Sequence, residues 1–270
     1  MLLAKLAAAA AALYLAVILA LALAQDRLLF PRWAVEGAAI PLPPAAARLS
    51  LAAGQGARLA GLHIPPERPP PEAAALILGF GGNAWDGDAL ALTLHRLFPD
   101  RHVVAFHYRG YGPSTGSPSA EALMADALAV HDHVAETLAP ARVVAVGLSI
   151  GAGPAAWLAS RRPLAGLILV TPFDSLRALA RHHYPWAPVG LVLRHRMEVA
   201  EAVAGTAAPV ALIAAERDTI VPPARSAPLR AAAADLVLDR TIEDAGHNDL
   251  YERAAFAEAM REALRRIEAR

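Results

Sequence analysis

The chain has 270 residues, of which 56% are hydrophobic, and its 25 basic and 25 acidic residues give a formal net charge of zero. This length is sufficient for one large α/β domain with a substantial core, and the neutral balance argues against a nucleic-acid-binding protein, which normally carries a basic excess. Because the sequence contains no cysteine, disulfides, thiolate metal sites and a cysteine nucleophile are excluded.

The first segment along the chain is an apolar stretch from Leu6 to Ala24, which follows Lys5. As a helix it would rise roughly 28 Å, enough to cross the hydrocarbon core of a bilayer. A retained anchor fits this length better than a cleaved secretory signal, whose apolar core runs about 7–15 residues, although Ala22-Leu23-Ala24 offers a small-x-small cleavage site. We therefore expect residues 1–30 to be an N-terminal transmembrane anchor or signal segment.

The charges that flank this stretch give no clear orientation by the positive-inside rule, because Lys5 precedes it and Asp26 and Arg27 follow it. Since the segment resembles an export signal, we expect a membrane-anchored protein whose following domain is extracytoplasmic, or a secreted protein if the segment is cleaved. The proline-rich residues 31–44 are then a linker, at the start of a domain that spans residues 31–270.

Beyond a second proline-rich turn at residues 65–71, short apolar runs alternate with longer helical segments. The runs that indicate strands buried on both faces are Ala74–Gly79, Val103–Tyr108, Arg142–Gly147, Gly166–Val170 and Val210–Ala214. The helix candidates are Asp86–Phe98, Ser119–Leu138, Ile150–Ser160, Pro222–Ala234 and a last helix from Asp249, placed as its N-cap, to about Glu268.

This alternation predicts an α/β fold, with a mostly parallel twisted sheet that is covered by helices on both faces. Residues 45–51 and 57–64 precede the first clear helix, so we expect them to form an antiparallel hairpin at one edge of the sheet. An insertion at about residues 172–208 is expected to form a short cap, or simply to pack over the neighbouring site.

A serine lies at the sharp turn where one predicted strand passes into a helix. The run Gly147-Leu148-Ser149-Ile150-Gly151 follows a buried strand, which is the strand–turn–helix context that a G-x-S-x-G nucleophile elbow requires. The glycines leave room for the backbone, and the turn projects the hydroxyl outward. We therefore expect Ser149 to be a catalytic nucleophile.

A serine nucleophile needs a base, and the base needs an acid that orients it. After such an elbow the acid and the histidine follow in that order along the chain. Asp218 follows the strand Val210–Ala214, and His247 precedes the last helix, so both lie at strand ends. Asp174, which follows the preceding strand, is the alternative acid.

The negative oxygen that forms during acyl transfer needs preorganised N–H donors, one of which comes from the residue after the nucleophile. That residue is Ile150. The glycine-rich loop at residues 79–84 follows a strand and permits close backbone approach. We expect the backbone N–H of Asn83 to be the second donor of this oxyanion hole; otherwise the loop is a plain glycine-rich turn.

Together these motifs resemble the α/β-hydrolase superfamily, and specifically its membrane-anchored serine hydrolases with an H-G-N-A oxyanion loop. The matching pieces are G-G-N-A at 81–84, Y-R-G-Y-G-P-S-T-G-S-P-S at 108–119, G-L-S-I-G at 147–151, D-T-I-V-P at 218–222 and G-H-N-D at 246–249. Gly81 stands where this group usually has histidine, which puts the rigidity of the loop in doubt more than the chemistry.

The resemblance and the motifs imply a serine hydrolase that cleaves an ester or thioester through an acyl-enzyme, as a carboxylesterase or lipid (acyl) hydrolase near a membrane. The substrate would be a small-molecule or lipid acyl ester, and neither a metal nor an organic cofactor is required. A serine peptidase or amidase of the same fold and a catalytically silent, membrane-tethered binding protein are the alternatives. Arg109 is either a ligand for an anionic substrate group or a structural hydrogen-bond donor to neighbouring loops.

Overall fold

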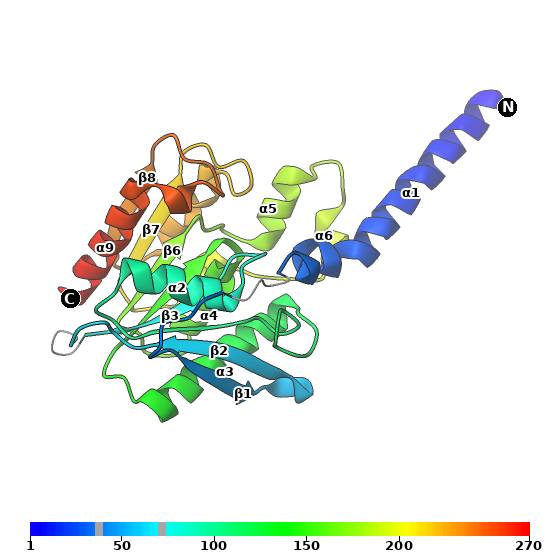
Figure 1. Ribbon diagram of the computed structural model, residues 1–270. Helices are drawn as coiled ribbons and strands as arrows, with labels where there is room; N and C mark the ends of the chain where they lie inside the picture. Colours follow the sequence, from blue (N-terminus) through cyan, green and yellow to red (C-terminus); the bar gives the residue numbers. More distant parts are fainter. Residues whose placement is uncertain (36–39, 70–73) are drawn as a thin grey trace.

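The computed structural model describes residues 1–35, 40–69 and 74–270. Its centre is an eight-stranded sheet in the order β1-β2-β4-β3-β5-β6-β7-β8 (Figure 1). Strands β3 to β8 pair in parallel, whereas β1 and β2 form an antiparallel hairpin at one edge. The strands are β1 (Ala47–Ala52), β2 (Arg58–Ile64), β3 (Leu76–Phe80), β4 (Val103–Phe106), β5 (Val143–Leu148), β6 (Gly166–Val170), β7 (Val210–Ala215) and β8 (Leu236–Ile242).

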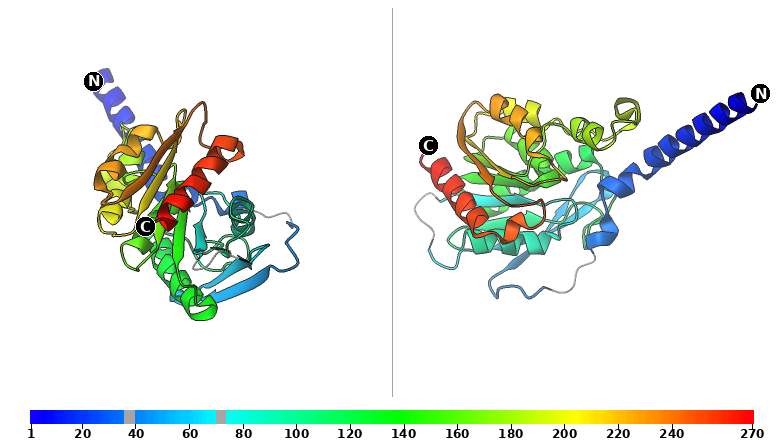
Figure 2. Two further views of the ribbon diagram at one scale, coloured as in Figure 1. Left: turned by 90° about the vertical axis from the view of Figure 1, so that its left-hand side faces the viewer. Right: turned by 90° about the horizontal axis from the view of Figure 1, so that it is seen from above.

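Helices cover both faces of this sheet (Figures 1 and 2). Each face has its own hydrophobic core. Helices α2 and α9 pack on one face, and α3, α4, α7 and α8 pack on the other. The helices are α1 (Leu2–Leu29), α2 (Gly87–Leu97), α3 (Ala120–Leu138), α4 (Ala152–Ala159), α5 (Leu176–His183), α6 (Val189–Val192), α7 (Val199–Ala204), α8 (Ala227–Ala232) and α9 (Ala254–Glu268). The predicted α/β fold class, with a mostly parallel sheet and an apolar N-terminal helix, is confirmed.

Local sequence signals explain where the helices begin. The Asp86 carboxylate accepts hydrogen bonds from the backbone N–H groups of Asp88 and Ala89 and thereby caps α2. Ser119 caps α3 in the same way, by accepting from the N–H of Ala122. Both caps sit at the residue that starts the apolar helical pattern, so these two helices begin within one residue of the predicted position.

The N-cap predicted for the last helix is wrong. Helix α9 begins at Ala254, because residues 250–252 form a separate 3-10 turn after Asp249. The Asp249 carboxylate accepts instead from the N–H of Gly246 at 2.7 Å and pairs with Arg253, so it braces the preceding loop. The helix predicted at 222–234 is likewise shorter, since a 3-10 turn precedes α8.

Parts of the predicted linker and proline-rich turn, residues 36–39 and 70–73, lie outside the described residues.

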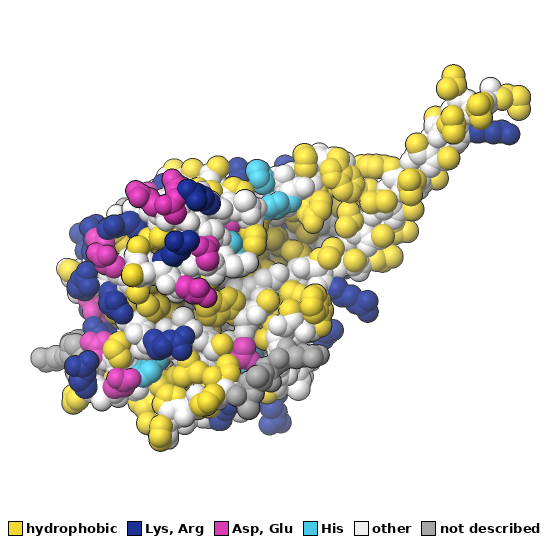
Figure 3. Space-filling model, turned by 45° about the horizontal axis from the view of Figure 1, so that its top comes forward, with side chains coloured by type: hydrophobic (Ala, Val, Ile, Leu, Met, Phe, Trp, Pro, Cys, Tyr) yellow, Lys and Arg dark blue, Asp and Glu magenta, His cyan; other side chains and the backbone are white. Residues whose placement is uncertain are grey.

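Helix α1 projects away from the domain and is covered by exposed hydrophobic side chains (Figures 1 and 3). In the described ranges it is the one helix with the length and composition to cross a membrane. The C-terminal part of α1 meets the domain, because Gln25 is buried and Phe30, directly after the helix, lies in the core of the domain. The end of α1 contacts the segment between β6 and β7, residues 172–208, which we call the cap segment and which contains α5, α6 and α7.

Candidate active site

The turn between β5 and α4 holds Ser149 in a strained backbone conformation. Its φ is +52°, in the left-handed region that residues other than glycine rarely adopt. A Cβ at Gly147 would lie 2.6 Å from the carbonyl oxygen of Gly151, and a Cβ at Gly151 would clash with the carbonyl oxygens of Phe80 and Gly81. At both positions the neighbouring backbone leaves no room for a side chain, so the motif needs glycine there. The elbow packs against the end of β3.

The structure brings Ser149, His247 and Asp218 together from three separate strand ends. His247 Nε2 lies 3.0 Å from Ser149 Oγ, and His247 Nδ1 lies 2.7 Å from Asp218 Oδ2. With the proton on Nδ1, the imidazole donates to the carboxylate and Nε2 is left to accept from the serine hydroxyl. The three side chains thus form one chain of hydrogen bonds in the order that proton transfer from the hydroxyl needs.

The Asp218 carboxylate is fixed on both sides. The residue is 4% exposed, and its Oδ1 accepts hydrogen bonds from the backbone N–H groups of Ile220 at 2.9 Å and Val221 at 2.7 Å. Its other oxygen is thereby directed at the histidine. Asp174, the alternative acid, instead pairs with Arg225 at 3.3 Å, so the structure favours Asp218 as the partner of His247.

A cavity of about 610 Å³ opens beside Ser149 and His247. Most of its walls are apolar, with residues from the cap segment on one side and from the loop after β3 on the other. Burial raises the pKa of Tyr251, one of its lining residues, to about 12, so this hydroxyl stays protonated near neutral pH. The cavity therefore suits an acyl group next to a hydroxyl nucleophile.

The two residues predicted as oxyanion donors, Ile150 and Asn83, line this same cavity. The loop that carries Asn83 is held by the hydroxyl of Tyr108, which donates to the carbonyl oxygen of Gly81 at 2.8 Å. Burial raises the pKa of Tyr108 well above its usual value, so the phenol remains a donor. The sequence did not predict this hydrogen bond. It fixes the loop at Gly81, the position where the membrane-anchored serine hydrolases that the chain resembles usually have histidine.

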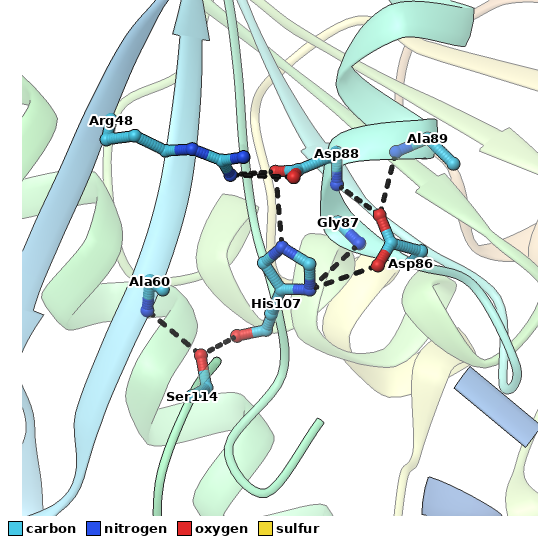
Figure 4. A network of polar contacts seen from close by, with 8 residues as sticks. All are labelled: Arg48, Ala60, Asp86, Gly87, Asp88, Ala89, His107 and Ser114. Carbon is cyan, nitrogen blue, oxygen red and sulfur yellow. Dashed lines mark hydrogen bonds and ion pairs between the residues drawn. The ribbon is translucent and has the colours of Figure 1, made fainter. Parts of the chain in front are cut away.

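A polar network around His107 holds the start of α2, just beyond the same loop (Figure 4). His107 is buried; its Nδ1 accepts from the N–H of Gly87 at 3.2 Å, and its Nε2 lies 3.2 Å from a carboxylate oxygen of Asp88. Asp88 also pairs with Arg48 on β1. The network joins the end of β4 to the helix that follows the loop. Its signal in the sequence was the position of His107 at a strand end.

Asp86, Asp88 and His107 also carry oxygen and nitrogen atoms within 4.8 Å of one another, a spacing that could suit a metal ion. These atoms already have hydrogen-bonding partners, because Asp86 caps α2 and Asp88 pairs with Arg48. The cluster is therefore accounted for as structural.

Arg109 is also a structural residue. It is 3% exposed and pairs with the carboxylate of Asp126 on α3, with its Nε at 2.7 Å from an oxygen. It does not line the cavity next to Ser149. Of the two roles considered for Arg109, the structural one fits, and the guanidinium is not available to an anionic substrate.

Comparisons with known proteins identify the family to which the chain belongs. A family described as "alpha/beta hydrolase fold" matches residues 76–193. The uncharacterized protein Rv2307c of Mycobacterium tuberculosis is 37% identical over 231 residues, which cover 83% of this chain and 81% of that protein. The chain belongs to the α/β-hydrolase family.

Two further similarities of this α/β-hydrolase are to lipid-cleaving enzymes. Lysophosphatidylserine lipase ABHD12 of Danio rerio is 33% identical over 143 residues, which cover 45% of this chain and 36% of the lipase. The crystal structure of a membrane phospholipase A, a bacterial virulence factor, superposes with a TM-score of 0.65 and 18% identity, covering 100% of this chain and 98% of the phospholipase. The second similarity is one of fold.

Proposed function

We propose that this protein is a serine hydrolase that cleaves an ester or thioester of an acyl group through an acyl-enzyme. The observation that carries the proposal is the continuous hydrogen-bonded chain from Ser149 Oγ through His247 to Asp218, at a strained elbow and beside an apolar cavity. A buried structural serine would not need this arrangement, whereas nucleophilic catalysis requires each part of it.

The proposed reaction has two steps. Ser149 Oγ attacks the acyl carbonyl carbon while His247 Nε2 takes the hydroxyl proton, and the protonated imidazole then gives this proton to the leaving group. In the second step, His247 Nε2 takes a proton from water, the resulting hydroxide attacks the acyl carbon, and the imidazolium returns the proton to Ser149 Oγ as the bond between Oγ and the acyl carbon breaks and the acid leaves. Asp218 holds the imidazole in its tautomer and stabilises the imidazolium. The chemistry needs neither a metal nor an organic cofactor.

The tetrahedral intermediate places a negative charge on the former carbonyl oxygen. We propose that the backbone N–H groups of Ile150 and Asn83 donate to this oxygen. Both residues line the cavity beside Ser149, and the Tyr108–Gly81 hydrogen bond stiffens the loop that contains Asn83. Prearranged donors stabilise the transition state because they need not reorganise when the charge forms.

We propose further that α1 is a retained membrane anchor and that the substrate is a lipid or other acyl ester found at the membrane. The length and the exposed apolar surface of α1 support the anchor. The names of one relative, a lysophosphatidylserine lipase, and of one protein of the same fold, a membrane phospholipase A, support an acyl ester as the substrate. We also propose that the domain lies on the extracytoplasmic side, because the N-terminal segment resembles an export signal.

The proposal is tested by measuring the turnover of p-nitrophenyl butyrate by the full chain in detergent, with Ser149→Ala and His247→Ala as matched variants. We expect turnover by the wild-type protein and a loss of about 10³-fold or more in each variant. Equal rates in all three would contradict the proposal and favour a silent binding protein. A p-nitroanilide cleaved faster than the ester would identify an amidase instead.

A further inference from the structure

A second hollow, a groove of about 180 Å³, lies between the end of α1 and the cap segment. Nine of its eleven lining residues are aliphatic, and the other two are Gln25 and Tyr184. Leu29 at the end of α1 lines both this groove and the cavity beside Ser149. On α5, Leu179 lines the cavity while its neighbour Ala180 lines the groove, so the two hollows adjoin along a common wall.

The polar atoms of Gln25 are not available to a ligand in this groove. The side chain is 6% exposed, and its Nε2 donates to the carbonyl oxygens of Ala22 and Val192, at 2.6 and 3.2 Å. Its Oε1 accepts from the N–H of Arg194 at 2.8 Å. The groove thus offers mostly hydrocarbon contact, which selects for an aliphatic occupant.

The groove also lies at the level along α1 where the hydrocarbon core of a bilayer would begin. Asp26 and Arg27 interrupt the apolar surface of α1 and are costly to place within a bilayer, so they mark the membrane–water boundary. Groove residues Leu21 and Ala22 lie on the apolar side of this boundary. An acyl chain can therefore pass from the bilayer into the groove without crossing water.

The cap segment also contacts α1 farther toward its N-terminus, at Trp186. The hydroxyl of Tyr14 donates to the carbonyl oxygen of Trp186 at 3.1 Å, and residues 14 and 26 are about 18 Å apart along the helix axis. Trp186 is 50% exposed and Leu191 is 90% exposed. Figure 3 shows hydrophobic side chains gathered on α1 and on the part of the domain beside it, with most charged side chains elsewhere.

We propose that the groove between α1 and the cap segment binds the acyl chain of a long-chain lipid ester whose carbonyl group lies at Ser149. The inference rests on the proposed function and narrows its substrate class. Leu29 lies at the junction of the groove and the cavity, and the cap segment contacts the apolar part of α1 at Tyr14. The membrane anchor is thereby part of the binding site for the substrate.

The test compares p-nitrophenyl palmitate with p-nitrophenyl butyrate, using the full chain in nanodiscs. Ala22→Trp fills the groove, and the matched control Ala20→Trp adds the same bulk about 200° around the helix, on an exposed face. We expect Ala22→Trp to lower the palmitate-to-butyrate ratio of kcat/KM about tenfold or more, and Ala20→Trp to leave it unchanged. An unchanged ratio in both variants, or an equal fall in both, would overturn the inference.

A second measurement does not depend on turnover or on the folding of Ala22→Trp. The Ser149→Ala protein is photolysed with palmitic acid that carries a diazirine in its chain, and then digested with trypsin. We expect adducts in the peptides of residues 6–27, 28–32, 178–181 and 182–194, which the basic residues of the sequence define and which together contain all the lining residues of the groove. Adducts only elsewhere would overturn the inference. Absence of ester turnover by the wild-type protein would instead contradict the proposed function.

Discussion

Asp218 Oδ2 lies 2.7 Å from His247 Nδ1, while the other oxygen of the same carboxylate accepts two backbone N–H groups. These hydrogen bonds therefore hold the carboxylate in position without a substrate. Asp218→Asn should leave the fold intact but favour the wrong imidazole tautomer, and kcat for p-nitrophenyl butyrate should fall on the order of 10³-fold or more. Asp174→Asn is the matched control, because Asp174 pairs with Arg225. A larger loss in the control than in Asp218→Asn would reverse the assignment of the acid.

The close packing behind the elbow predicts that Gly151→Ala abolishes ester turnover. Its Cβ would clash with the carbonyl oxygens of Phe80 and Gly81, so either the elbow or the loop after β3 must move. Gly54→Ala is the control, since a Cβ there meets nothing within 4 Å. Turnover and thermal unfolding of both variants check this, and full activity of Gly151→Ala would refute the geometry of the elbow.

Loss of the hydroxyl that holds the oxyanion loop should slow the reaction without unfolding the protein. Tyr108→Phe keeps the ring but removes the donor to Gly81, which costs about 1 kcal/mol of stability. We expect kcat to fall about tenfold with little change in KM, because the loop acts on the intermediate more than on the bound substrate. A change in KM alone would assign Tyr108 to substrate binding instead.

A stacked histidine pair, with His63 on β2 and His102 directly before β4, predicts a pH-dependent stability. His63 Nε2 lies 2.9 Å from His102 Nδ1, and burial lowers the pKa of both imidazoles below their usual value of 6.5. The unfolded chain then binds more protons than the folded chain, so stability falls as pH drops through about 6.5. Thermal unfolding at pH 7.5 and 5 should show this loss, and His102→Asn should reduce it. An equal pH dependence in the variant would rule the pair out.

The contacts of Gln25 predict that α1 is retained. Cleavage after Ala24 would remove Leu21 and Ala22 from the groove and place a charged amino terminus on Gln25, beside its hydrogen bonds to the cap segment. Intact-mass spectrometry of protein from the membrane fraction should therefore find the N-terminal segment present. A mature chain that begins at Gln25 would contradict this expectation.

The parts of the fold and site that the sequence predicted depend on local patterns. Buried strands read as continuous apolar runs, and the helix caps at Asp86 and Ser119 stand directly before their helices. Ser149, Asp218 and His247 could be selected because each follows a strand, and parallel strands bring such positions to one edge of the sheet.

The parts that were missed depend on contacts between distant segments. The Tyr108–Gly81 hydrogen bond and the His107 network join residues from separate strand ends, and no local pattern distinguishes a bonded tyrosine from an ordinary core residue. The groove beside Gln25 exists only because α1 meets the cap segment. The start of α9 was predicted too early because Asp249 has the residue type of a cap but binds Gly246.

Covalent labelling by a fluorophosphonate probe, with the modified residue located by mass spectrometry, tests directly whether Ser149 is the nucleophile. We expect one labelled serine, Ser149. Labelling should be lost in Ser149→Ala and strongly slowed in His247→Ala, while Ala20→Trp should be labelled like the wild-type protein. Folded wild-type protein that is not labelled, or labelling that persists in Ser149→Ala, would contradict the claim that this serine is the nucleophile.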